Sequence, residues 1–237
     1  MKLKVIFNPA ILYVLIFSLA HTEAASCQDT EMITKTWEVG DFNEAELEGA
    51  FKIFLVQGNT SSIMARAADS RVFEYLNIRN KQGLLNLKVE RKPFDFSRLE
   101  IYITFKTLTR LEADGGTTLE TDGYLNLGDM FIRLRGGSKM KFYAKADDLR
   151  LVNEGGVLVE LSGVADNLDV RLAGAGHINA SELRAGDVNF TIEGVGTGTV
   201  HATRTLNARI KGAGKLTYRG NPRVTKTIEG VGSVQEE

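Results

Sequence analysis

The sequence predicts an all-β protein, a parallel β-solenoid of the right-handed β-helix-like type. Three observations predict this class: glycines recur every 18–21 residues, apolar and polar residues alternate between them, and proline is rare. The 237 residues include 24 glycines and 3 prolines. Since average usage is about 7% glycine and about 5% proline, the composition favours many tight corners and few interrupted strands.

The first 26 residues are typical of a signal peptide. Lys2 and Lys4 precede an apolar stretch at 10–20, and small residues at 24–26 supply a cleavage site. As a helix this stretch would be about 17 Å long, too short for a hydrocarbon core of about 30 Å. We therefore expect no membrane span in the mature chain, which is exported to the periplasm, the outer membrane or the cell surface.

Cys27 is the only cysteine, so no intrachain disulfide can form. Residues 24–27, AASC, resemble a bacterial lipobox, in which the cysteine is lipidated and becomes the mature N-terminus. Ala24 departs from the usual leucine or valine, and His21 and Glu23 separate the cysteine from the apolar stretch. Lipidation at Cys27, which would give a lipid anchor in the outer membrane, and ordinary cleavage both stay open.

Seven glycines mark the corners of the predicted repeats. The positions two, four and six residues before each glycine are mainly apolar, and the positions between them are mainly polar, which is typical of a strand with one buried face. The alternation resumes afterwards, so each repeat is interpreted as strand, glycine corner, strand and short turn. Glycine suits a corner because it reaches positive φ at little steric cost and lets backbones approach. The seven are Gly115, Gly136, Gly155, Gly174, Gly194, Gly212 and Gly230.

The repeats are expected to stack, since a short strand pair cannot bury its apolar face alone and each coil can cover the next. The residues directly before the seven glycines support this register, because neighbouring repeats carry opposite charges wherever both are charged. These residues are Asp114, Arg135, Glu154, Ala173, Glu193, Lys211 and Glu229. The last repeat has Lys226 and Glu236 at core positions and is expected to cap the stack.

The chain before the regular repeats is rich in β patterns but less periodic. Gly49 is interpreted as an earlier corner, and 70–78 fits a helix or a strand equally well. The expected strands are 51–58, 84–91 and 99–105. The expected organisation is a signal peptide at 1–26, a tether at 27–36 and a single domain at 37–237, less regular over 37–108 and regular over 109–237.

A loop is expected at 91–97, around Pro93. Its Phe94 and Phe96 could form a binding feature, although such aromatic rings more often pack onto the sheet beneath them. We expect the packed arrangement.

The sequence contains no recognisable catalytic, metal or cofactor constellation. His177 and His201 follow glycine corners and are expected at the surface, whereas a zinc site needs three or four closely placed ligands. The segments GAGHIN and GVGTGT lack the Lys-Ser/Thr and the helix of a phosphate loop. The near balance of 29 Lys plus Arg against 30 Asp plus Glu argues against nucleic acid as a partner.

One outward column of the predicted solenoid leaves an enzymatic alternative open. It contains Glu112, Arg133, Arg171 and Arg209, which could line up as a carbohydrate-binding or catalytic face, as on the β-solenoids of polysaccharide lyases and hydrolases. A solvated column is the simpler interpretation, because no two carboxylates at glycosidase separation can be identified.

Two stretches of the chain resemble the putative auto-transporter adhesin head GIN domain family, found in exported bacterial proteins, especially of the Bacteroidetes. Residues 42–63, FNEAELEGAFKIFLVQGNTSSI, resemble its opening run. Residues 210–234 resemble its terminal repeats, including the turn Gly220-Asn221-Pro222. The resemblance covers about residues 37–234. It implies a β-helix-like fold and a role in adhesion or surface contact, and it brings no agreed catalytic residues.

We therefore expect an exported, non-catalytic envelope or surface protein that contacts a surface protein or a glycan through its solenoid face. The alternatives are a carbohydrate-active enzyme or carbohydrate-binding module on a β-helix, and a self-associating envelope scaffold. Open solenoid ends and exposed edges make a homo-oligomer plausible.

Overall fold

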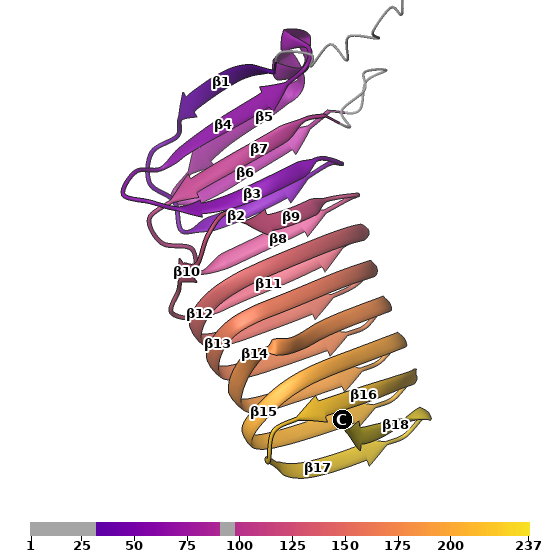
Figure 1. Ribbon diagram of the computed structural model, residues 1–237. Coiled ribbons are helices and arrows are strands. Elements are labelled where there is room, and N and C mark those ends of the chain that lie inside the picture. The colour runs from indigo at the N-terminus through magenta and orange to yellow at the C-terminus, as the bar shows by residue number, and fades with distance from the viewer. Residues whose placement is uncertain (1–31, 91–97) are drawn as a thin grey trace, which may run out of the picture. The chain divides into compact units, whose positions relative to one another are not determined.

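The structure is a computed structural model in which residues 32–90 and 98–237 are described, and it contains a parallel β-solenoid of about 7 turns (Figure 1). The predicted fold class is thereby confirmed. The predictions for the signal peptide, Cys27 and the loop at 91–97 lie outside the described residues.

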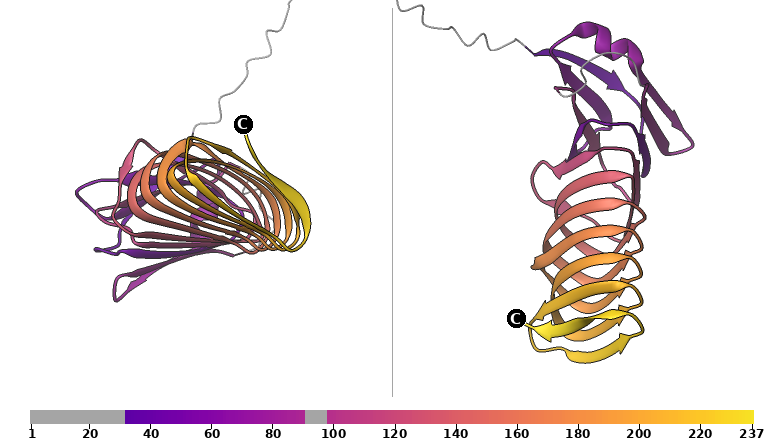
Figure 2. Two further views of the ribbon diagram at one scale, coloured as in Figure 1. Left: turned by 90° about the horizontal axis from the view of Figure 1, so that it is seen from below. Right: turned by 90° about the vertical axis from the view of Figure 1, so that its right-hand side faces the viewer.

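The regular coils follow one another in chain order, and each pairs in parallel with the next (Figure 1). Seen along the stack, successive coils superimpose (Figure 2). Their strands are β11 (Met130–Arg135), β12 (Gly137–Asn153), β13 (Gly156–Leu172), β14 (Ala175–Ile192), β15 (Val195–Ile210), β16 (Ala213–Arg219), β17 (Arg223–Ile228) and β18 (Val231–Glu236).

The coils differ in one respect from the predicted repeat of two strands joined by a short turn. In β12 to β15 a single strand of 16–18 residues runs from one glycine corner to the next. The parallel pairing continues through the predicted turn, from Ala144↔Gly163 to Asp148↔Asn167 between β12 and β13, so the chain bends without leaving the ladder.

The coils before β11 are not stacked in chain order. β2 (Glu44–Glu48) lies between β6 (Leu84–Val89) and β8 (Arg110–Asp114), and all three are parallel. β3 (Lys52–Gln57) lies likewise between β7 (Glu100–Phe105) and β9 (Thr118–Thr121). The coil formed by β2 and β3 is therefore inserted between two coils that follow it in the chain.

Antiparallel strands complete the N-terminal end of the described stack. β1 pairs with β4, β4 with β7, and β5 with β6. The bounds of these elements are β1 (Ile33–Glu38), β4 (Ser62–Ala67) and β5 (Leu76–Lys81), and the 3-10 helix η1 (Ser70–Tyr75) precedes β5. The short β10 (Leu125–Asn126) pairs in parallel with β12. The segment that fitted helix or strand equally well is both, since η1 leads directly into β5, and β1 begins inside the segment predicted to be a tether.

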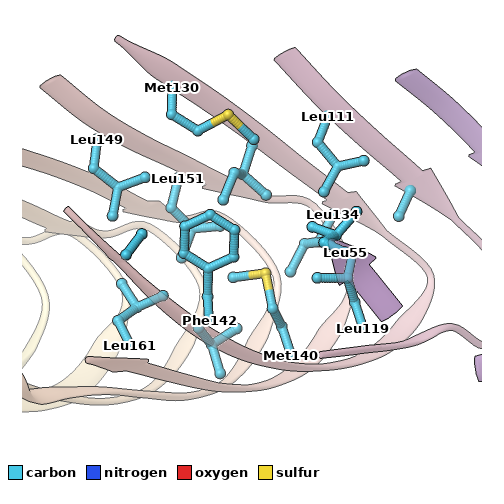
Figure 3. Close-up of a cluster of buried hydrophobic side chains, with 14 of the residues drawn as sticks. Leu55, Leu111, Leu119, Met130, Leu134, Met140, Phe142, Leu149, Leu151 and Leu161 are labelled. Atoms are coloured by element: carbon cyan, nitrogen blue, oxygen red, sulfur yellow. The ribbon is translucent and has the colours of Figure 1, made fainter. Parts of the chain in front are cut away.

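The core lies inside the coils, where the inward residues of facing strands meet (Figure 3). Leu111, Met130 and Leu149 point toward Met140 and Phe142, and all five are buried. This arrangement follows from the period-2 pattern, because each strand sends alternate side chains inward and removes their apolar surface from water.

The seven predicted corner glycines stack on one another, with Gly49 beneath Gly115. A Cβ on Gly115 would lie 2.1 Å from the Gly49 carbonyl oxygen, and one on Gly194 would lie 1.8 Å from that of Gly174. Positive φ explains only the first two, Gly115 (121°) and Gly136 (79°), because the other five have φ outside the left-handed region. For those five, the close approach of successive backbones explains the glycine.

The last coil ends the stack with a charged side chain at a core position. Lys226 of β17 continues the column of Ala208. Its Nζ donates to the Val234 carbonyl at 2.8 Å and lies 5.9 Å from the centre of the Tyr218 ring. An inward-pointing charge of this kind discourages another coil from adding to the open end.

Candidate functional site: a charged groove

A groove of about 570 Å³ lies on the outer surface of the N-terminal coils. Five strands form it side by side, in the order β5, β6, β2, β8 and β11. Because alternate side chains of each strand point outward, the groove is lined mainly by charged and amide side chains above a buried apolar layer. Six basic and four acidic side chains line it; we call it the charged groove.

The strand register brings five polar residues into one row across the charged groove. Arg79 pairs with Asn86, Asn86 with Glu46, Glu46 with Glu112, and Glu112 with Arg133. The row has cations at both ends, and carboxylates and an amide between them. Four strand spacings separate the two arginines, about 19 Å along the sheet.

Glu112 organises one wall of the charged groove. The residue is only 7% exposed, and its carboxylate forms ion pairs with Arg110, with Arg135 at 2.9 Å and with Arg133 at 3.6 Å. Burial by itself raises the pKa of Glu112, but the hydrogen bond from Arg110 and the charges of the three arginines outweigh it and hold the pKa below the ordinary value. The carboxylate therefore stays ionised and holds three guanidinium groups together.

Arg133 is fixed in place although, within the described chain, it donates no hydrogen bond. Its guanidinium lies 5.2 Å from the centre of the Phe131 ring, and its other charged neighbour is Glu154 at 3.9 Å. Arg110 and Arg150 also lie against this ring, at 5.3 and 5.9 Å. Its Nε is buried without a hydrogen-bond partner among the described residues, and with the side chain 29% exposed Arg133 lines the groove as an oriented cation.

The cations on the opposite wall form fewer ion pairs than those around Glu112. Arg79 and Lys81 of β5 are exposed, and no ion pair links either to another described residue. Lys88 pairs with Glu48 at 2.7 Å. Glu46, in the middle, has no ion-pair partner in the described part of the chain, so the centre of the groove offers a free carboxylate.

The predicted outward column is only partly brought into this site. Glu112 and Arg133 lie in the charged groove, whereas Arg171 and Arg209 occupy the same column on later coils, outside it. There Arg171 pairs with Glu193 at 2.6 Å, and Arg209 with Glu229 at 3.8 Å. Sequence reasoning missed the wall formed by β5, β6 and β2, because the pairing of these strands is not sequential.

The two histidines among the described residues do not come together. His177 lies in β14, with its Nδ1 2.6 Å from the Thr197 hydroxyl, and His201 lies in β15. Across residues 32–90 and 98–237, no group of three or more His, Cys, Asp and Glu side chains could hold a metal ion.

A second, smaller hollow of about 320 Å³ lies near the bend of the coils. Tyr143 lines it beside Lys141, Glu160 and Asn179. Tyr143 and Tyr124 are 48% and 45% exposed, and their rings meet edge to face at 4.6 Å. This pair is a second exposed polar and aromatic surface, on a different side of the coil from the charged groove.

A stack of parallel coils with a charged groove on its outside places the protein among the parallel β-solenoids. More narrowly, the chain belongs to the family described as putative auto-transporter adhesin, head GIN domain, whose model matches residues 41–222. The resemblance inferred from the sequence is thus confirmed. No curated protein matches the chain.

Solved structures share the fold. A putative adhesin from Bacteroides fragilis has a TM-score of 0.78 and 22% identity, covering 87% of this chain and 97% of its own. A putative adhesin from Parabacteroides merdae has a TM-score of 0.67 and 22% identity, over 88% and 97%. A putative lipid binding protein from Parabacteroides distasonis has a TM-score of 0.62 and 21% identity, over 88% and 98%. Within the described residues, no helix has the length and apolarity needed to cross a bilayer.

Proposed function

We propose that this protein is an exported, non-catalytic adhesion protein of the cell envelope that binds its ligand through the charged groove. Family membership supports a surface adhesin-like role. The observation that carries the choice of surface is Arg133, a partly exposed cation held against Phe131 in a groove of about 570 Å³.

The chemistry of Glu112 supports a binding role over a catalytic one. A glycosidase needs a carboxyl group whose pKa is raised so that it can donate a proton. Burial acts in that direction on Glu112, but the hydrogen bond from Arg110 and the three arginine charges reverse it, and the pKa is lowered. Release of sugars or unsaturated products from any polysaccharide by the purified protein would contradict this part of the proposal.

The adhesion role is tested by deletion and complementation. Cells that lack the protein should attach less well to glycan-coated or protein-coated surfaces, and the wild-type gene should restore attachment. Attachment that is unchanged by deletion, together with no binding of the purified protein to surface glycans or envelope proteins, would refute the role.

Export and anchoring rest on the N-terminal residues. The apolar stretch at 10–20 and the AASC segment at 24–27 support a cleaved signal, with lipidation at Cys27 as one route. Labelled palmitate incorporated by the wild-type protein and not by Cys27→Ser would establish a lipid anchor. Cleavage without label would establish an ordinary signal peptide.

A further inference from the structure

We propose that the charged groove binds an acidic polysaccharide in which charged sugars are separated by neutral ones. The inference rests on the proposed function and deepens it by naming the ligand class. It follows from three properties of the groove: where its cations lie, what lies between them, and what the strands beneath exclude.

The positions of the cations favour a ligand with negative charge at its two ends. Arg133 has a fixed position against Phe131, and its partly exposed guanidinium, which donates no hydrogen bond to a described residue, suits a carboxylate or sulfate. Arg79 and Lys81 provide positive charge on the opposite wall, free of ion pairs with other described residues. About four strand spacings, or about 19 Å, separate the two ends, so one ligand must extend over several sugar units to reach both.

The side chains at the centre of the charged groove favour neutral hydroxyl groups in the middle of the ligand. Glu46 is an exposed carboxylate without an ion-pair partner among the described residues, and Glu48 lies beside it on β2. The amides of Asn77 and Asn86 also line the groove, and no described residue forms a hydrogen bond with either side chain. Carboxylates accept hydrogen bonds from hydroxyls and amides both accept and donate, whereas a ligand charged at every unit would be repelled by Glu46 and Glu48.

The strands beneath the charged groove argue against a peptide. β6, β2 and β8 are each paired on both sides, so no peptide strand can add within the floor of the groove. β5, the outermost strand of the groove, pairs only with β6 among the described strands, and a strand added at its other edge would lie beyond Arg79 and away from Arg133. Leu47 and Leu87 line the floor but are only 2% and 1% exposed, so the floor offers no apolar pocket for a side-chain anchor. Nucleic acid is disfavoured because it carries a negative charge on every unit, and Glu46 and Glu48 would repel such a chain.

The test compares three polymers for binding to the purified full-length protein at low salt. Deacylated gellan carries one uronate in every four sugars, so that neutral sugars can lie over Glu46 while uronates reach both ends; polygalacturonate carries a carboxylate on every sugar, and dextran is neutral. Gellan should bind most tightly, with an affinity that falls as salt is added, because the contacts are ionic. Binding of dextran or polygalacturonate equal to that of gellan would overturn the proposal.

Variants assign the binding to the charged groove. Arg133→Gln should weaken gellan binding about tenfold or more, the loss expected for one charged hydrogen bond. Arg209→Gln, in the same column outside the groove, should leave binding unchanged. Arg79→Gln should also weaken binding, and because Arg79 is exposed this variant stays informative if Arg133→Gln fails to fold. Equal effects of the Arg79 and Arg209 substitutions would overturn the assignment.

The central carboxylate gives a test of ligand pattern. Glu46→Gln should improve polygalacturonate binding and narrow the difference in affinity from gellan, since it removes the repulsion at the centre of the groove. No change in this difference would contradict the proposed pattern of widely spaced charges.

The ligand class and the adhesion role can fail separately. Attachment that needs the protein but is unaffected by Arg133→Gln and Arg79→Gln would overturn the ligand assignment and leave the role standing. Gellan binding through the charged groove, with attachment unchanged on deletion, would overturn the adhesion role and leave the ligand assignment standing.

Discussion

Substitution of Gly194 by alanine tests why glycine occupies the corners of the coils. The new Cβ would lie 1.8 Å from the Gly174 carbonyl oxygen, whereas Cβ contacts under 3.0 Å are essentially never seen. The two backbones must therefore separate locally by at least 1.2 Å, which is 3.0 minus 1.8. The corner hydrogen bonds from the N–H of Gly194 to the Leu172 carbonyl (3.2 Å) and from Val195 to Gly174 (3.0 Å) would lengthen with it.

The expected cost follows from these contacts. Overpacking of a close contact costs about 1–3 kcal/mol, and each of the two weakened hydrogen bonds about 1 kcal/mol, so we expect Gly194→Ala to lower the free energy of unfolding by about 3–5 kcal/mol. Urea denaturation followed by circular dichroism measures this. Gly156→Ala is the matched control, because a Cβ there meets nothing within 4 Å. Equal denaturation midpoints for the two variants would refute the backbone-contact explanation.

Three further predictions concern charge. Glu112→Gln should lower the free energy of unfolding by about 1–3 kcal/mol, because three partly exposed arginines lose their shared counter-charge; urea denaturation, with the exposed Glu160→Gln as a near-neutral control, measures this. The hydrogen bond from Arg171 holds the pKa of Glu193 below the ordinary 4.5, as the arginines do for Glu112. The stability from such carboxylates is therefore present above pH 4.5 and lost as the pH falls through their folded values, so the Tm should decline on acidification, and a Tm that rises would contradict this. Lys226→Leu should promote self-association at the open end, visible in sedimentation; a monomer at every concentration would show that Lys226 does not protect it.

The regular coils could be predicted from the sequence because their determinants are local. Alternation places every second side chain inward, and equivalent residues on successive coils contact one another, as Leu151 does in register with Val170. The glycine spacing then sets the coil length. The reason for the glycines was predicted in part: positive φ applies at Gly115 and Gly136, and close backbone contact explains the others.

The candidate site could be predicted only in part. The column of Glu112 and Arg133 follows from the glycine register, and its outward position was expected. The opposite wall was not, because β2 is inserted between β6 and β8 and no local pattern reveals this order. The alternation in 44–48 shows that Glu46 points outward, but not which strand lies beside it.

By itself, the sequence determined the class of the fold, the register of the regular coils and the family, because period-2 burial and fixed glycine spacing allow one economical way of stacking. Only the tertiary structure decided that the early strands are interleaved with later ones and that the coils bend without a turn. It also decided that Arg79 and Arg133 face one groove. These features depend on pairing between distant segments, and the free energy of such pairing comes from contacts that a single strand does not contain.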